Sequence, residues 1–169
     1  MCNQIVTFIF VTIQLRLKLI IMNPQIEIKK IYYHPIEVVW SALTEKEALS
    51  DWLMETNDFE LIVGHSFQLK TKPQGNFDGI LKCKVLSIDA PNSISYSWQS
   101  NGMKNPTKVS WSLKALDKEK THLSLIHNGF EGVSGWLTRQ MLNFGWKGLL
   151  SKKLKDYLQD ETRSMASTS

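Results

Sequence analysis

The chain has 169 residues, of which 43% are hydrophobic and 21% charged, so it can bury one core and its composition excludes a disordered protein. The net charge is +4 and the basic residues are scattered, so neither nucleic acid nor a membrane is favoured as a partner. Cys2 and Cys83 are far apart, and Cys83 lies in an alternating apolar stretch. This predicts a buried free thiol and a reducing, cytoplasmic setting.

Residues 1–22 are strongly apolar, but they match no targeting signal well. No positive charge precedes the apolar part and no small-residue cleavage site follows it, as a secretory signal requires. Arg16 and Lys18 interrupt it, whereas a membrane span needs about 20 apolar residues. We expect residues 1–22 to be an extension outside the domain, with Met22 as the natural start. An extra edge strand or a short N-terminal helix are the alternatives.

The domain is expected over residues 23–160 and begins with a strand over Gln25–Tyr33, where β-branched and aromatic residues alternate with polar ones. Pro35 is suited to the first position of a helix, which an apolar stripe at helical spacing continues. Thr44 and Glu47 match a capping box, which predicts a second short helix to about Met54. The stripe of the first helix consists of Ile36, Val39, Trp40 and Leu43.

Six further strands are predicted from alternating apolar residues separated by turn residues. Their clean alternation indicates an antiparallel sheet that is buried on one face only. The predicted strands are 59–63, 66–70, 79–88, 94–99, 108–115 and 121–127.

The last element is a long amphipathic helix that ends near Asp160, and residues 161–169 are expected to form a disordered tail. Arg139 and Lys153 fall on its apolar stripe, where their charges either reach out to solvent or meet an acidic ligand. A helix this apolar needs a large surface, and the one-sided sheet supplies it, so the predicted fold class is α+β. The stripe consists of Trp136, Leu142, Trp146, Leu149, Leu150, Leu154 and Tyr157.

Several spaced segments, taken in order from Gln25 to Tyr157, carry a resemblance to a known family. They are Tyr33–Thr44 (YHPIEVVWSALT) with Trp52 after it, Phe77-Asp-Gly79, Asp89-Ala-Pro91 with Ile94–Trp98 (ISYSW), Pro106–Val109 (PTKV), Thr121–Phe130 (THLSLIHNGF), and Gly145-Trp146 followed by Leu149, Leu150 and Leu154. The chain resembles the activators of the heat-shock-protein-90 ATPase, within the START, polyketide-cyclase and birch-pollen-allergen (SRPBCC) superfamily. The resemblance implies a helix-grip fold, in which a curved antiparallel sheet wraps around the C-terminal helix.

The resemblance also implies a cavity between the long helix and the concave sheet, where members of the superfamily bind apolar ligands. We therefore expect a non-enzymatic domain that binds a small apolar molecule, either a lipid or an aromatic compound. The alternative for the same side chains is a filled core, because aromatic stripes also pack solid. The expected pocket residues are Phe67, Leu69, Leu81, Cys83, Tyr96, Trp98, Trp111, Leu125, His127, Trp146 and Leu150.

His127 ends a predicted strand at the expected pocket mouth, where it is either an acid–base group or a hydrogen-bonded structural histidine. One alternative function is therefore a cyclase or hydrolase that uses His127 or Tyr96 in the same cavity. A second is a stress protein that contacts a heat-shock chaperone through its surface. The sequence contains no metal-ligand spacing, nucleophile elbow or phosphate loop, so no catalytic residue, metal or cofactor is expected. The chain is expected to be a monomer or a homodimer.

Overall fold

The computed structural model describes residues 25–167, with side chains through Glu161. One strand and two short helices come first, followed by five strands and one long helical segment. In chain order the elements are β1 (Ile26–Tyr32), α2 (Ile36–Thr44), α3 (Lys46–Trp52), β2 (Ser66–Lys70), β3 (Ile80–Asp89), β4 (Ser93–Ser100), β5 (Thr107–Asp117), β6 (Lys120–Asn128), α4 (Gly132–Gly148), the π-helical turn η1 (Leu149–Lys153) and α5 (Leu154–Ser167).

The six strands form one antiparallel sheet in the order β1-β6-β5-β4-β3-β2. The first strand pairs with the last, with Ile28 opposite Leu125, so the beginning of the domain lies beside its end. Along β6, buried side chains alternate with half-buried ones, as the sequence predicts for a sheet with one covered face.

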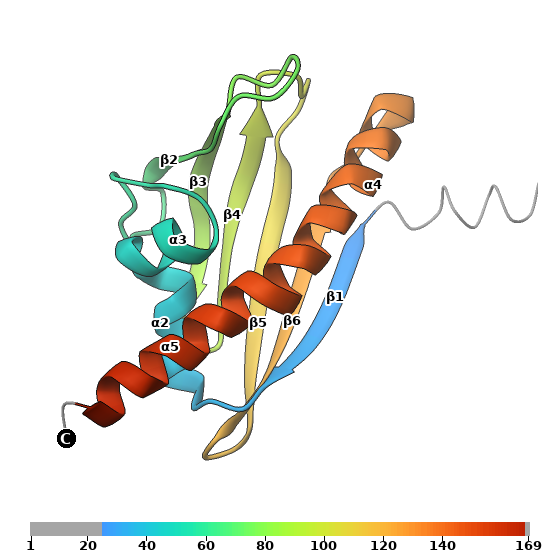
Figure 1. Cartoon of the computed structure of the whole chain (residues 1–169). Helices are drawn as coiled ribbons and strands as arrows, with labels where there is room; N and C mark the ends of the chain where they lie inside the picture. The colour runs from blue at the N-terminus through green and yellow to red at the C-terminus, as the bar shows by residue number, and fades with distance from the viewer. Residues whose placement is uncertain (1–24, 168–169) are drawn as a thin grey trace, which may run out of the picture.

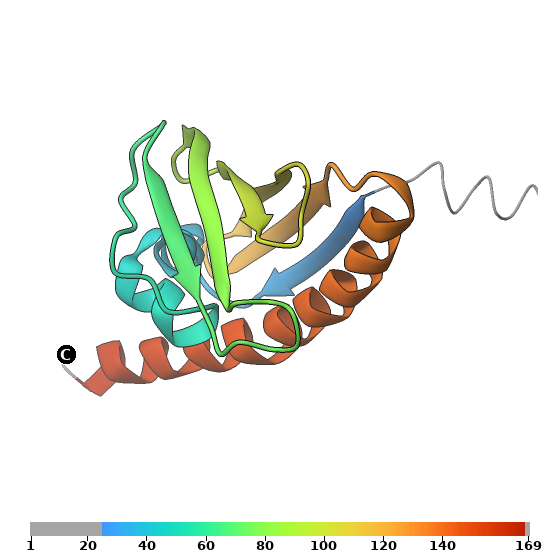
Figure 2. The same cartoon turned by 90° about the horizontal axis from the view of Figure 1, so that it is seen from above.

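The long helix lies across the open side of the curved sheet, and α2 and α3 close one end of it (Figures 1 and 2). Leu150, Leu154 and Leu158 are fully buried at a spacing of four residues, and they anchor the second half of this helix on the core. The architecture is the α+β helix-grip fold predicted from the sequence.

The apolar stripe of the long helix differs from the predicted one, and at Lys153 the reason is the change of winding at η1. A π turn holds an extra residue and so rotates the residues that follow it about the helix axis. Lys153 is exposed, although uniform α-helical winding placed it on the stripe. Trp136 is 42% exposed and lies outside the core. Arg139 is half-buried, and its guanidinium donates to the carbonyl oxygen of Gln25 at 3.4 Å.

The strand predicted over residues 59–63 is wrong. Phe59 is buried against Phe67, with ring centroids 4.9 Å apart, but the apolar residues after it are exposed. Among the described residues, the outer edge of β2 is joined by the isolated bridge between Glu55 and Lys70, and residues 59–63 pair with no strand. They form a loop, in which the amide of Gly64 still donates to the carbonyl oxygen of Val85.

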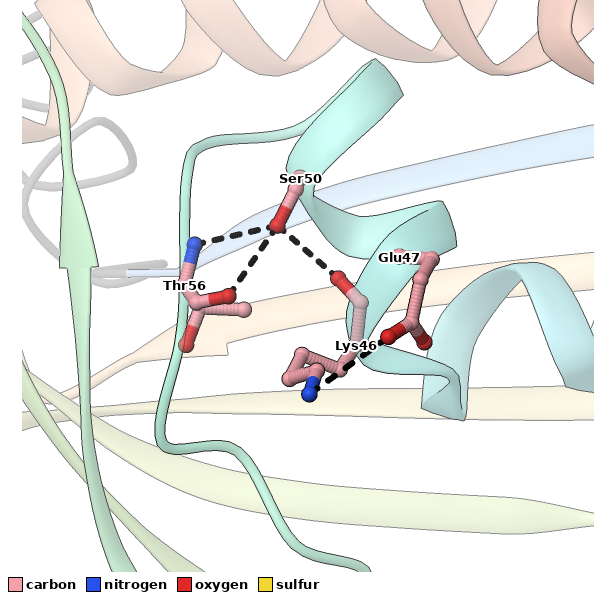
Figure 3. A network of polar contacts seen from close by, with 4 residues as sticks. All are labelled: Lys46, Glu47, Ser50 and Thr56. Atoms are coloured by element: carbon pink, nitrogen blue, oxygen red, sulfur yellow. Dashed lines mark hydrogen bonds and ion pairs between the residues drawn. The ribbon is translucent and has the colours of Figure 1, made fainter.

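The predicted capping box is also absent, since the Thr44 hydroxyl donates back to the carbonyl oxygen of Trp40 and Glu45 precedes the first residue of α3. Ser50 instead ties α3 to the following loop (Figure 3). Its Oγ accepts from the Thr56 amide at 3.1 Å and lies within hydrogen-bond distance of the carbonyl oxygens of Lys46 and Thr56. This network holds the loop that replaces the predicted strand.

The helix continues beyond its predicted end, because α5 runs to Ser167 through most of the segment expected to be a disordered tail. The segment 1–22 lies outside the described residues, and so does Cys2. Within residues 25–167, no helix combines the length and apolarity that crossing a membrane requires.

Candidate ligand-binding site

All eleven side chains expected to line a pocket lie together in the interior, and none is more than 5% exposed. They come from β2 to β6 on the sheet side, and from α4 and η1 on the helix side. Strand pairing explains their meeting: Phe67 lies opposite Cys83, Cys83 opposite Trp98, and Val109 opposite His127. The sequence therefore identified one continuous cluster correctly, and its role in binding stays a prediction.

Aromatic rings fill the middle of this cluster. Trp146 of α4 packs on Trp98 and Trp111 of the sheet, with ring centroids 5.2 and 5.4 Å apart. Tyr96 continues the row, 6.5 Å from Trp98 and 5.7 Å from Phe67. Tyr96 and Trp98 are stacked, and the other pairs are tilted or edge-on, which are favourable geometries for aromatic rings. The two contacts of Trp146 thus hold the helix to the sheet.

A chain of hydrogen bonds crosses the same interior. The indole N–H of Trp146 donates to Nδ1 of His127 at 3.1 Å, and Nε2 of His127 lies 2.7 Å from Oγ1 of Thr107. The Thr107 hydroxyl donates to the carbonyl oxygen of Trp98 at 3.0 Å. Because Nδ1 accepts and the threonine hydrogen is already used, His127 carries its proton on Nε2 and donates it to Thr107. We call Trp146, His127, Thr107 and the Trp98 carbonyl the buried polar chain.

The buried polar chain keeps His127 neutral. Burial lowers the pKa of its imidazole from 6.5 to about 3. A second proton would go on Nδ1, where it would face the N–H of Trp146. His127 is thus a structural histidine, one of the two roles expected from the sequence, with both nitrogens bonded.

Tyr96 is equally unsuited to acid–base work. Burial raises the pKa of its phenol well above the usual value of 10.0, and its oxygen accepts from the indole N–H of Trp111 at 2.9 Å. Every buried side-chain nitrogen and oxygen among the described residues has a hydrogen-bond partner. The interior polar groups are therefore satisfied by the protein itself.

A hollow of about 120 Å³ opens at the end of the interior, between the β4–β5 loop and the start of α4. Phe130 lines it, and the same ring lies 4.7 Å from the His127 ring, centroid to centroid. Thr107 of the buried polar chain lines the hollow as well, so Phe130 and Thr107 together form the boundary between the hollow and the interior. The remaining lining consists of Gly102, Met103, Lys104, Asn105, Thr107, Gly129, Glu131, Ser134, Gly135 and Thr138.

A second hollow of about 340 Å³ lies on β2, β3 and β4, where most of its lining side chains are exposed or half-buried polar groups such as Gln68, Lys82 and Ser97. Cys83 contributes to its floor as a buried free thiol, in agreement with the sequence. Burial raises the pKa of this thiol to about 12, with a smaller contribution from the charge of Asp58. Such a thiol is unreactive in the folded protein.

Sequence reasoning missed two parts of this arrangement. Thr107 was not a candidate, because a threonine at the start of a strand carries no signal that its hydroxyl will meet a histidine 20 residues later. Phe130 appeared only within a family motif, although it forms part of the wall between the hollow and the core. In residues 25–167 no group of three or more histidine, cysteine or acidic side chains is placed to hold a metal ion.

Comparisons with known proteins show which family the chain belongs to. The family model for Activator of Hsp90 ATPase homolog 1-like protein matches residues 33–159. The solved structure of protein MLL2253 from Mesorhizobium loti is 25% identical, with a TM-score of 0.70 over 80% of this chain and 97% of that one. No curated protein matches in sequence.

Two further structures share the fold at lower identity. PFC0360w, an HSP90 activator from Plasmodium falciparum, is 23% identical, with a TM-score of 0.55 over 71% of this chain and 86% of that one. The Aha1 dimer from Colwellia psychrerythraea is 20% identical, with a TM-score of 0.62 over 79% and 95%. Since the family model spans most of the chain, the protein belongs to the Activator of Hsp90 ATPase homolog 1-like family.

Proposed function

We propose that this domain binds a small molecule with an apolar body, which enters at the hollow beside Phe130 and reaches toward the aromatic interior. The observation that carries the proposal is the double contact of Phe130, which lines the hollow and whose ring packs against His127. One side-chain movement would therefore join the hollow to the eleven-residue cluster.

The size of the hollow limits the ligand. A volume of about 120 Å³ is close to that of an engineered apolar cavity of ~150 Å³ that holds benzene. A single aromatic ring or a short acyl chain fits without rearrangement, whereas pockets for larger ligands are typically ~300 Å³ or more. A larger molecule requires the Phe130 ring to turn away from His127.

The polar rim of the hollow suits an uncharged or mixed head group. Ser134 and Thr138 of α4 offer hydroxyls, and Lys104 brings a positive charge. Glu131 brings a negative charge close by and accepts from the side-chain amide of Asn105 at 3.4 Å. Because the two charges oppose each other, the rim does not select a strongly acidic ligand.

Binding is a better assignment than catalysis for the same residues. An acid–base catalyst needs a group that titrates near the working pH, whereas the pKa of His127 is lowered to about 3 and that of Tyr96 is raised. A similar fold in DynU16, described as a putative protein in the dynemicin biosynthetic locus, is compatible with a small-molecule role. Contact with a heat-shock chaperone, suggested by the name of the P. falciparum protein, stays an alternative.

The test is a binding series with benzyl alcohol, cyclohexanol and 1-octanol, monitored by tryptophan fluorescence and by thermal shift. Trp98 and Trp146 lie next to His127, so a ligand that passes Phe130 is expected to change their emission. Met103→Trp should fill the hollow and abolish binding, because Met103 is a half-buried lining residue. Gln68→Trp is the matched control, since it adds the same side chain to the second hollow.

Binding that is lost in Met103→Trp and kept in Gln68→Trp supports the proposal. Phe130→Ala removes the wall and should bind the largest probe more tightly than the wild type does. If no probe binds the wild type or Phe130→Ala, or if Gln68→Trp abolishes binding and Met103→Trp does not, the proposal is wrong.

A further inference from the structure

The first half of α4 is apolar on the face that points away from the core. From Gly132 to Gly145 it has no buried residue, and large apolar side chains project into solvent. Val133 is 79% exposed and Phe144 is 82% exposed. We call the residues on this face the outer stripe: Val133, Trp136, Leu137, Met141 and Phe144.

Helical geometry places these side chains together. At ~100° per residue, the outer stripe covers about 140° of the helix circumference. Trp146, which packs into the core, lies on the opposite side of the same helix. Figures 1 and 2 show that this half of the helix projects past the first residue of β1 and that no other helix or strand of residues 25–167 lies over its outer side. The helix therefore has two apolar faces, and only one of them packs against the core of the domain.

The outer stripe gathers its apolar side chains on one side of the helix, with the exposed polar side chain of Gln140 among them. Its five side chains expose roughly 600 Å² of mostly apolar surface, at the upper end of the largest patch on a typical monomer. Leaving such a surface in water is unfavourable by about 25 cal/mol per Å² of apolar area. A partner that covers it would recover this free energy.

We propose that the outer stripe is the interface of a homodimer, in which α4 packs against α4 of a second copy about a two-fold axis. The choice of a second copy as the partner follows from the lack of charge on this surface. Between Gly132 and Trp146 the only charged residue is Arg139, which already donates to the Gln25 carbonyl of its own chain. A surface without charge offers nothing to select a charged foreign partner, whereas a two-fold axis pairs it with an identical stripe.

The area agrees with this assignment. Two stripes bury on the order of 1,200 Å² together, which is the lower limit for a specific and stable interface. The dimer is thus expected to dissociate on dilution. Gln140 has the central position of the stripe, three residues after Leu137 and four before Phe144, so the two copies of Gln140 should lie close to the axis.

Dimerisation is independent of the proposed ligand site. Ser134, Gly135 and Thr138 line the hollow from another face of α4, so the outer stripe remains free when the hollow is filled. Loss of the dimer would leave the ligand proposal intact, and loss of ligand binding would leave the dimer.

The experiment uses the full chain in sedimentation equilibrium over a wide concentration range. Leu137→Glu places a charge on a stripe residue that is 58% exposed, and it should weaken the dimer by at least about ten-fold. Ile62→Glu is the control, because Ile62 is 56% exposed on the loop before β2. Both variants should keep the far-ultraviolet circular dichroism spectrum of the wild type.

Gln140→Cys, made with Cys2→Ser, tests the geometry separately. It should form an intermolecular disulfide on mild oxidation, since helices in contact bring residues at the axis within disulfide distance. Concentration-dependent dimers that are lost in Leu137→Glu but kept in Ile62→Glu, together with this cross-link, support the proposal. A monomer at every concentration overturns it, and so does a dimer that Leu137→Glu leaves unchanged or that Gln140→Cys does not link.

Discussion

The Tyr32 hydroxyl donates a hydrogen bond of 2.7 Å to the carbonyl oxygen of Leu150. It joins the end of β1 to the π turn of the C-terminal helix across 118 positions of sequence. Both residues are buried, and burial raises the pKa of the phenol above its usual value of 10.0, so the donor keeps its proton. This contact fixes the helix on the sheet at the point where its winding changes.

Tyr32→Phe is expected to lower the free energy of unfolding by about 1–3 kcal/mol, because it leaves a buried carbonyl without its outside partner and changes little else. Urea unfolding measures this value from the midpoint at constant slope. Tyr33→Phe is the control, since Tyr33 is the next residue and is exposed. Equal stability of the two variants would show that the Tyr32 hydroxyl has no such role.

Local sequence patterns predicted most of the fold. Period-two alternation identified every strand that has a ladder partner, because one face of the sheet is buried and the other is not. The strand predicted over residues 59–63 rested on the same kind of local pattern, but in the structure Leu61, Ile62 and Val63 are exposed and their segment pairs with no strand. The π turn at Leu149–Lys153 could not be predicted either, because no sequence motif specifies it. In the structure it coincides with the hydrogen bond from Tyr32 to the carbonyl oxygen of Leu150.

In the candidate site, too, local patterns predicted some features and non-local contacts determined the others. The eleven buried residues could be predicted because each lies on the apolar phase of its own strand or helix. The buried polar chain could not, because the partner of each group lies on a neighbouring strand or on α4, as with Thr107 and His127. The outer stripe was not predicted, because the helical period placed Trp136 and Trp146 on one buried stripe. In the structure only Trp146 is buried.

The neutral state of His127 predicts a loss of stability in acid. Its pKa is lowered to about 3 in the folded protein and is near 6.5 when unfolded, so between these values the unfolded chain binds more protons. The stabilising contribution is therefore fully present above pH 6.5 and is lost as the pH falls toward 3. The loss is on the order of 5 kcal/mol, measured as the free energy of unfolding against pH.

His127→Gln separates the contribution of His127 to the loss of stability in acid from the contribution of the aspartate and glutamate side chains. The variant should be less stable than the wild type at pH 7, but the difference should shrink as the pH falls from 6.5 toward 3, because glutamine does not titrate. A constant difference at every pH would mean that His127 does not cause the acid loss.

Thr107→Val tests the buried polar chain while nearly keeping the side-chain volume. It removes the acceptor of the Nε2–H of His127 and the donor to the Trp98 carbonyl. The free energy of unfolding should fall by roughly 2–4 kcal/mol, because two buried polar groups lose their partner. Thr107→Ser keeps the hydroxyl and should recover most of the loss; if serine is as destabilising as valine, packing of the methyl group matters and the hydrogen bonds do not.

Cys83 should react with a thiol reagent only when the protein opens. Its pKa is raised to about 12 by burial, so almost no thiolate is present at pH 8 in the folded state. In the Cys2→Ser variant, labelling with a chromogenic disulfide is expected to be slow in buffer and to reach a fast limit in urea. Rapid labelling in buffer alone would show that the sheet around β3 opens without global unfolding.

Gly79 just before β3 is predicted to tolerate no side chain. Its φ is +82°, and an added Cβ would overlap the carbonyl oxygen of Thr71. Thr71 is held beside Gly79, because its backbone amide donates a hydrogen bond of 2.8 Å to the carbonyl oxygen of Gly79. Gly79→Ala should therefore lower the free energy of unfolding by at least about 2 kcal/mol. Gly102→Ala is the matched control, because a Cβ there meets nothing within 4 Å and the backbone has no positive φ. Chemical denaturation of the two variants side by side measures the difference, and equal stability would show that the turn before β3 can shift to admit a methyl group.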